Sequence, residues 1–289
     1  MKRLLITGGS GFVGGHLLSQ GRGVWEVFST FRSHPFSLPG VSGLVLDLEN
    51  GDEIRDVVRR IRPDVIIHCA AWSDLDGCEK DRDRAFRINA EATGVIAETG
   101  SVLGCRLIYT STDMVFDGEK GDYDESDPTG PINVYGESKL AGEERIEKFC
   151  SDYVVARVAL IYGSPVTGCN SFSERILDRV RQGKVMPLFT DQYRTPILVQ
   201  NLAKALLELA GTVFSGTIHL GGRERVDRYA FGLRLAELRG FPAKVLRPVS
   251  MSEIQTVASR PRDVSLDTSK AKRLLKTELL GYREGLKQA

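Results

Sequence analysis

The feature that most constrains the fold of this chain is a glycine-rich turn near its amino terminus. The turn follows the short apolar run Leu4–Ile6 and opens an amphipathic stretch through Leu17 and Leu18. Glycine allows a tight turn and lets backbone amides approach a pyrophosphate, while the amino terminus of the following helix adds partial positive charge. The turn therefore predicts a dinucleotide site, with a merely structural glycine turn as the alternative. The expected cofactor contacts are Gly8, Ser10, Gly11, Phe12, Val13 and Gly14.

The first half of the chain alternates between apolar runs and segments with helical periodicity. The expected strands are Leu4–Ile6, Val24–Phe31, Gly43–Leu46, Val65–Ile67, Leu107–Tyr109 and Tyr153–Tyr162, and the expected helices include Asp52–Ile61, Ala85–Leu103 and Tyr135–Phe149. Such alternation is typical of a parallel, doubly wound α/β sheet of the Rossmann type. Ligands bind such sheets outside the carboxyl ends of the strands, so functional residues should follow strands directly.

The pattern loosens after Tyr162, where helical stretches near 172–181, 198–209, 229–238 and 269–275 are separated by turns with proline and glycine. We expect residues 1–162 to form the dinucleotide-binding domain. Residues 163–289 should form a smaller substrate-binding lobe, with some elements returning to the sheet.

Composition narrows the class of protein. Hydrophobic residues make up 42% of the chain, charged residues 27%, and the net charge is +1. This balance is typical of a soluble globular protein and argues against a nucleic-acid binder. The amino terminus has no signal-peptide pattern, no apolar run is long enough to span a membrane, and the five cysteines fit no zinc pattern. We therefore expect a cytoplasmic protein that holds no tightly bound metal ion and binds neither a membrane nor nucleic acid.

The end of the second expected strand bears on cofactor choice. NAD-binding versions of the fold carry a carboxylate there to accept hydrogen bonds from the ribose hydroxyls. This chain has Arg32 instead, and the next acid is Asp47. A guanidinium cannot accept those bonds but pairs well with a 2′-phosphate. The sequence favours NADP(H) over NAD(H), unless Arg32 is only a solvated surface charge.

A second motif, Tyr135-Gly136-Glu137-Ser138-Lys139, begins an expected helix and places a phenol and an ammonium four residues apart, on one helix face. A nearby cation favours the phenolate, so the tyrosine can exchange a proton with a substrate oxygen while hydride moves at the adjacent carbon. A hydroxyl in the segment Ser111-Thr112-Asp113 can hold the same carbonyl oxygen. Asp113 can accept from a sugar hydroxyl, orient the loop, or simply cap a turn.

Together these motifs resemble the extended short-chain dehydrogenase/reductases, and within them the dTDP-4-dehydrorhamnose reductases and their relative, the regulatory beta subunit of methionine adenosyltransferase. The likeness includes residues 115–118 (VFDG), 140–143 (LAGE), 191–196 (DQYRTP) and 260–263 (RPRD), so it spans most of the chain. Where the family usually has tyrosine after Ser-Thr-Asp, this chain has Met114.

The resemblance implies a catalytic set of Thr112, Tyr135 and Lys139 and reduction by NADPH of the 4-keto group of a dTDP-linked 6-deoxysugar, as in rhamnose biosynthesis. It also implies substrate contacts from Asp113, Arg194 and Arg260 and a possible homodimer through the 85–103 and 135–149 helices. The strand around Arg157 and Val158 would line the cofactor channel. Further implied cofactor contacts are Asp47, Leu48, Ala70, Ala71 and Asn89, besides Tyr135 and Lys139.

Three functions stay open at this point. The first is the keto-sugar reductase, with a nucleotide sugar as its substrate. The second is a nucleotide-sugar epimerase, or a reductase of different stereochemistry, that uses the same residues. The third is a non-catalytic subunit that keeps the cofactor site as a structural element.

Overall fold

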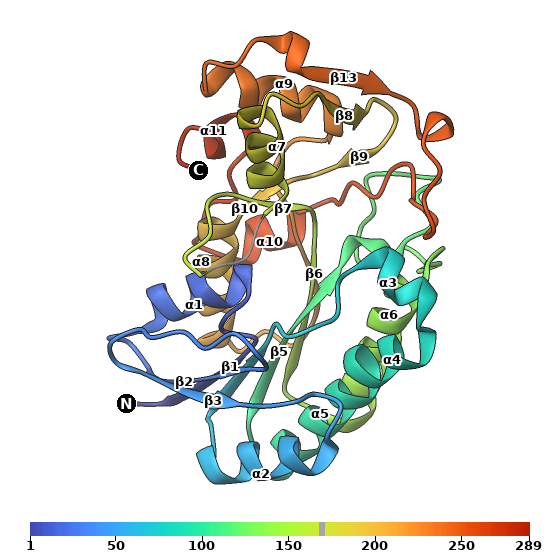
Figure 1. The fold of residues 1–289 in the computed structure, drawn as a ribbon. Helices are drawn as coiled ribbons and strands as arrows, with labels where there is room; N and C mark the ends of the chain where they lie inside the picture. Colours follow the sequence, from blue (N-terminus) through green and yellow to red (C-terminus); the bar gives the residue numbers. More distant parts are fainter. Residues whose placement is uncertain (168–170) are drawn as a thin grey trace.

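The centre of the protein is a parallel sheet of seven strands. The computed structural model describes residues 1–167 and 171–289, and Cys169 lies outside them. The strands follow the order β11-β6-β5-β4-β1-β2-β3, and every neighbouring pair runs parallel. Helices cover both faces of the sheet (Figure 1). The expected α/β class with a Rossmann-type doubly wound sheet is confirmed.

The first half of the chain supplies six of the seven strands. Its elements are β1 (Arg3–Thr7), α1 (Phe12–Gly21), β2 (Glu26–Phe31), β3 (Val41–Val45), α2 (Gly51–Ile61), β4 (Val65–His68), α3 (Leu75–Lys80), α4 (Arg82–Phe86), the π-helical turn η1 (Arg87–Glu91), α5 (Ala92–Val102), β5 (Arg106–Thr112), the 3-10 turn η2 (Asp113–Val115), α6 (Val134–Phe149) and β6 (Tyr153–Val158).

Local sequence explains several of these elements. The Asn50 side chain caps α2 by accepting bonds from the amides of Asp52 and Glu53, and the apolar residues at helical spacing all face inward. In β4 every side chain is buried, as expected for a central strand covered on both faces.

The expected single helix over 85–103 is interrupted in the structure. Between α4 and α5 the backbone widens into η1, where the Asn89 carbonyl accepts bonds from the hydroxyls of Thr93, at 2.7 Å, and Tyr109, at 3.3 Å. A side-chain hydroxyl that donates to a helix carbonyl competes with the backbone amide for that carbonyl and often bends the helix. The helix α3 was not expected.

The second half of the chain builds a lobe and also returns to the sheet. Its elements are β7 (Ile161–Tyr162), α7 (Phe172–Arg181), β8 (Met186–Phe189), β9 (Tyr193–Arg194), β10 (Ile197–Leu198), α8 (Val199–Ala210), β11 (Gly216–Leu220), β12 (Val226–Asp227), α9 (Arg228–Leu238), η3 (Ala243–Val245), β13 (Leu246–Val249), η4 (Met251–Glu253), α10 (Ser269–Leu274) and α11 (Tyr282–Gly285). The expected strand 153–162 ends early, because β7 leaves the sheet and pairs with β10.

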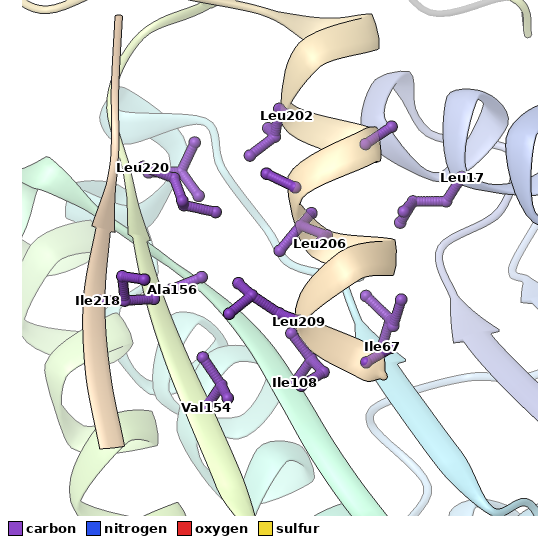
Figure 2. Packing of buried hydrophobic residues seen from close by; sticks show 14 of the residues in the cluster. Leu17, Ile67, Ile108, Val154, Ala156, Leu202, Leu206, Leu209, Ile218 and Leu220 are labelled. Atoms are coloured by element: carbon purple, nitrogen blue, oxygen red, sulfur yellow. The ribbon is translucent and has the colours of Figure 1, made fainter. Parts of the chain in front are cut away.

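Two apolar layers hold the sheet. On one face, α1 and α8 cover the strands, and Figure 2 shows Leu202, Leu206 and Leu209 of α8 directed at side chains of the sheet. On the other face α2, α5 and α6 pack against the alternate strand residues, such as Leu5 and Ile66. A separate apolar cluster around Phe231 fills the lobe formed by α7, α9, β8 and β13. The division of function at residues 162 and 163 stays a prediction.

The exposed face of α6 includes Glu144, Arg145, Glu147 and Lys148, so pairing of this helix with a second copy also stays a prediction. None of the helices in the described part of the chain is long and apolar enough to cross a bilayer.

We expect Leu206→Ala to lower the free energy of unfolding by about 2–5 kcal/mol, because it opens a cavity between α8 and the sheet. Leu206 is fully buried, with 0% of its surface exposed. Urea denaturation of both proteins measures the difference. Val213→Ala is the control, since Val213 is 100% exposed and should change stability by less than about 0.5 kcal/mol. Equal losses in the two variants would contradict the packing described here.

Candidate active site

One cavity of about 790 Å³ runs along the carboxyl edge of the sheet, between the glycine turn and α6. This volume is in the usual range for a cofactor site. Most of the expected cofactor contacts line it, namely Gly8, Ser10, Gly11, Phe12, Val13, Gly14, Arg32, Asp47, Leu48, Ala70, Ala71, Tyr135 and Lys139. The other expected site residues lie outside its lining; they are Asn89, Thr112, Asp113, Arg194 and Arg260.

The glycine turn packs too tightly for a side chain at its last position. A Cβ at residue 14 would lie 2.1 Å from the Gly8 carbonyl oxygen. The Gly11 amide donates to that same carbonyl at 2.9 Å, and α1 begins at the next residue. The turn therefore brings the amino terminus of a ten-residue helix to the cavity wall. This cradle fits the pyrophosphate of a dinucleotide.

The far end of the cavity is lined by charged side chains from the ends of β2 and β3. Arg32 Nε lies 3.7 Å from Asp47 Oδ2, and the Arg32 side chain is 55% exposed. Asp47 Oδ1 also accepts from the Glu49 amide at 3.0 Å. A half-exposed guanidinium at this end is well placed for an anionic group on an adenosine ribose.

The start of α6 lies unusually close to the end of β5. Asn133 caps the helix by accepting a bond from the Gly136 amide at 2.8 Å, and a Cβ on Gly136 would lie 2.2 Å from the Met114 carbonyl oxygen. Because of this approach, Tyr135 and Lys139, one helical turn apart, both line the cavity. The structure brings them together with the glycine turn.

Lys139 is a buried cation with 1% of its surface exposed, and its Nζ lies 4.0 Å from the centre of the Tyr109 ring. Burial lowers the pKa of Lys139 to about 7, although the acidic groups of Cys69 and Glu143 oppose the shift. The ammonium is therefore only partly populated at neutral pH when the cavity holds no cofactor.

Burial also has the largest effect on the pKa of Tyr135. It raises the pKa of Tyr135 well above the usual value; a hydrogen bond from Thr112 counteracts the shift, and the charge of Asp113 adds to it. Without a cofactor in the cavity, burial therefore opposes the expected phenolate. A neutral phenol is the form that donates a proton.

Thr112 connects this tyrosine to a buried ion pair. The Thr112 hydroxyl donates to Asp113 Oδ1 at 3.2 Å, and Asp113 Oδ2 lies 3.6 Å from Arg194 Nε. The side chains of Asp113 and Arg194 are 5% and 1% exposed. Arg194 Nη2 donates to the Pro261 carbonyl at 3.3 Å. The pair thus ties the end of β5 to the lobe.

A second arginine lies near this pair. Burial, and next the charge of Arg194, lower the pKa of Arg228 to about 9. Its Nε donates to Gln192 Oε1 at 2.9 Å, and its guanidinium lies 4.5 Å from the centre of the Phe172 ring. The Phe172 ring lines the cavity together with Arg175. The lobe side of the cavity is therefore cationic.

Arg260 closes the lobe over α3. Its Nη2 donates to Asp76 Oδ1 at 2.8 Å, and the same oxygen accepts the Ala258 amide at 3.0 Å. The segment expected to close over substrate therefore contacts the dinucleotide half through one carboxylate on α3.

Two further residues expected near the cofactor, Asn89 and Arg157, make contacts that fix the elements around the cavity. Asn89 accepts the Trp72 amide at 2.8 Å and donates to Ser138 Oγ at 3.0 Å. Arg157 forms a buried pair with Glu143, with Nη2 and Oε2 2.8 Å apart, while the next residue, Val158, lines the cavity. Both side chains join α6 to the neighbouring elements.

Several cavity residues escaped the sequence motifs. Trp72 and Ser73 directly follow Ala70 and Ala71, so the rule that sites follow strands would have found them. Arg84 and Arg175 lie on helices and reach the cavity only through tertiary packing, and no sequence signal marks them. In the described residues no group of three or more His, Cys, Asp and Glu side chains is placed to hold a metal ion.

We compared the chain with known protein families and with related proteins. The model of the RmlD substrate binding domain matches residues 1–289. The chain is 33% identical over 227 residues to "Probable low-salt glycan biosynthesis reductase Agl14" of Haloferax volcanii, which covers 78% of this chain and 76% of the relative. It is 29% identical over 298 residues to methionine adenosyltransferase 2 subunit beta of Mus musculus, which covers 100% of this chain and 87% of the relative.

A solved structure is also similar throughout. The crystal structure of dTDP-4-dehydrorhamnose reductase from Bacillus anthracis str. Ames in complex with NADP has a TM-score of 0.87 and 28% sequence identity, and the match covers 99% of this chain and 98% of that chain.

We expect Lys139→Met to stabilise the fold at pH 7 by a few kcal/mol, because the variant removes the desolvation cost of a buried amine. The pKa of Lys139 is lower in the folded chain than in the unfolded one, so the unfolded chain binds more protons between about pH 7 and 10. Stability from this group therefore rises with pH over that window. The stability difference between variant and wild type, measured by urea denaturation, should shrink over the same window. A difference that does not vary with pH would contradict the assignment.

Proposed function

The chain belongs to the family of the RmlD substrate binding domain, and from its site we propose that it is an NADPH-dependent reductase of a keto-sugar linked to a nucleotide. The observation that carries the proposal is the shared cavity, in which Tyr135 and Lys139 face the same space as the glycine turn. In finer detail we propose the 4-keto group of a 6-deoxysugar, as in dTDP-4-dehydrorhamnose. The similarity to a dTDP-4-dehydrorhamnose reductase of known structure supports this choice.

The cofactor supplies hydride to the carbonyl carbon when it is bound. The glycine turn and the amino terminus of α1 hold the pyrophosphate, and Arg32 at the other end favours a 2′-phosphate. The NADP named with the Bacillus anthracis structure supports a preference for NADPH.

Tyr135 donates the proton that the new alkoxide oxygen needs. Its raised pKa keeps the phenol protonated at neutral pH, which is the state that reduction requires. We assign Thr112 the second hydrogen bond to the carbonyl oxygen, which its hydroxyl donates after turning away from Asp113 Oδ1. Lys139 supplies the positive charge that stabilises the phenolate after the transfer.

The lobe supplies the substrate side. Asp113 and Arg194 are buried against each other, so we propose that they act by orienting Thr112 and the loop around it. Arg260, whose side chain is 20% exposed, is proposed to contact the nucleotide part as the lobe closes over α3.

When nucleotide-linked 4-keto-6-deoxysugars are supplied to the purified protein, NADPH should be oxidised stoichiometrically. The loss of absorbance of the reduced nicotinamide measures this oxidation. Tyr135→Phe should lower kcat by about 100-fold or more, because it removes the proton donor but preserves the shape of the site. Cofactor affinity should stay within about 2-fold in that variant, since it loses no contact with the phosphates. No turnover across dTDP-, UDP- and GDP-linked keto-sugars would contradict the proposal.

We expect kcat/KM for NADPH to fall as pH rises through about 7, because this parameter reports on the cofactor-free enzyme, in which Lys139 loses its proton there. The charge of Lys139 is present below this pKa and absent above it. A pH profile at low NADPH concentration measures the falling limb. A profile that stays level to about pH 9 would show that the charge of Lys139 is not needed.

A second candidate function follows from the similarity to the methionine adenosyltransferase subunit over the whole chain. In that case the protein would bind a cofactor and a partner but would catalyse nothing. Loss of turnover in Tyr135→Phe with cofactor binding preserved separates the reductase from such a subunit. An epimerase of the same superfamily is separated by stoichiometry, because it returns its cofactor unchanged in each cycle.

A further inference from the structure

We propose that Arg84 joins Arg32 in binding the 2′-phosphate of NADPH, and that Glu49 holds both arginines until the phosphate displaces it. The inference rests on the cofactor preference in the proposed function. It adds Arg84 from α4 and Glu49 from the turn after β3, neither of which any motif of the sequence marks.

Two guanidinium groups converge on one carboxylate oxygen. Glu49 Oε2 lies 3.2 Å from Arg84 Nη2 and 3.9 Å from Arg32 Nη2. Arg84 Nε also donates to this oxygen, at 3.2 Å. The two arginines come from segments far apart in the sequence, yet both can reach a single small anion. A phosphate has three strong acceptor oxygens, enough for both at once.

Both arginines face the space where the cofactor ends. Arg32 and Arg84 line the cavity beside Asp47 and Leu48, and their side chains are 55% and 32% exposed. The Arg84 guanidinium also lies 5.1 Å from the centre of the Trp72 ring, a contact that favours one position of the side chain. Arg84 is thus held by both Glu49 and Trp72, whereas the more exposed Arg32 makes longer contacts with Asp47 and Glu49.

Acidic and basic side chains meet at this end of the cavity. A third arginine, Arg87, lies 3.6 Å from Glu49 Oε1 but does not line the cavity. Arg32, Arg84 and Arg87 contact the carboxylates of Asp47 and Glu49. A third carboxylate, that of Glu53, accepts from the Asp47 amide at 3.3 Å. A 2′-phosphate gives Arg32 and Arg84 a new anionic partner, and the ribose hydroxyl of NADH does not.

Energetics make the exchange favourable. Partly exposed ion pairs such as those of Glu49 contribute only about 0–1 kcal/mol each. Hydrogen bonds between arginine and phosphate are shorter and about twice as strong as neutral ones. Glu49 nevertheless repels the incoming phosphate, so its charge sets a limit on NADPH affinity.

Three variants test the site by fluorescence titration with NADPH and NADH and by competition with 2′,5′-ADP. We expect Arg84→Gln to weaken NADPH and 2′,5′-ADP by about 10-fold or more and NADH by less than about 2-fold. Glu49→Gln should raise the preference for NADPH over NADH by about 3-fold or more, because it removes the competing charge. The loss in Arg84→Gln should shrink as salt is added.

Arg82→Gln is the matched control. Arg82 lies on the same helix as Arg84, and its substitution removes the same charge. The Arg82 side chain pairs with Glu137 and does not line the cavity. The preference for NADPH should be unchanged in this variant. Thermal unfolding of all variants checks that the fold is intact.

An unchanged preference in Arg84→Gln would overturn the assignment of Arg84, and a lowered preference in Glu49→Gln would overturn the displacement of Glu49. These titrations need no sugar substrate. If the variants change NADPH binding as expected but no keto-sugar is turned over, the phosphate site stands and the proposed reductase activity does not. If keto-sugars are turned over but Arg84→Gln leaves the preference for NADPH unchanged, the reductase activity stands and the phosphate site does not.

Discussion

The close approach of α6 to the end of β5 is the constraint on which the site depends. Gly136 lets the first turn of α6 pack against the Met114 carbonyl, and Asn133 fixes where the helix begins. A side chain at position 136 would push this helix outward and shift Tyr135 and Lys139 in the cavity that the glycine turn shapes from the opposite side. The position of these two side chains is thus set by backbone packing between two elements.

The interior beside this helix is rich in charge, and each charge is held differently. Glu143 and Arg157 form a hydrogen-bonded buried pair, and the Ser111 hydroxyl also donates to Glu143. Within residues 1–167 and 171–289, Lys139 makes no comparable carboxylate contact, and it lies over the ring of Tyr109 instead. Buried ions that are well paired keep their charge, whereas a weakly paired one shifts its pKa. The burial of Lys139 without such a partner accounts for its lowered pKa.

Much of the fold and part of the site could be predicted from the sequence, because both depend on local patterns. The β-branched run in β4, the capped periodicity of α2 and the position of Tyr135 and Lys139 on one helix face are all readable within a few residues. Long-range effects were not readable. The convergence of Arg84 on Glu49 requires two segments to meet, and so does the burial of Arg194.

The pKa of Tyr135 shows the same limit. Spacing along the helix predicts a neighbouring cation, but the desolvation of both groups depends on walls supplied by other elements. The sequence therefore identified the chemical groups of the site, and the structure was needed to find the proton each of them carries.

The return of the chain to the sheet has a consequence for biosynthesis. The face of the sheet that α8 covers, and the edge of β6 that β11 pairs with, stay uncovered until the ribosome has added residues well past the last strand of the first half. A nascent chain paused near residue 162 would expose an unpaired strand edge beside a broad apolar surface, and this combination promotes aggregation.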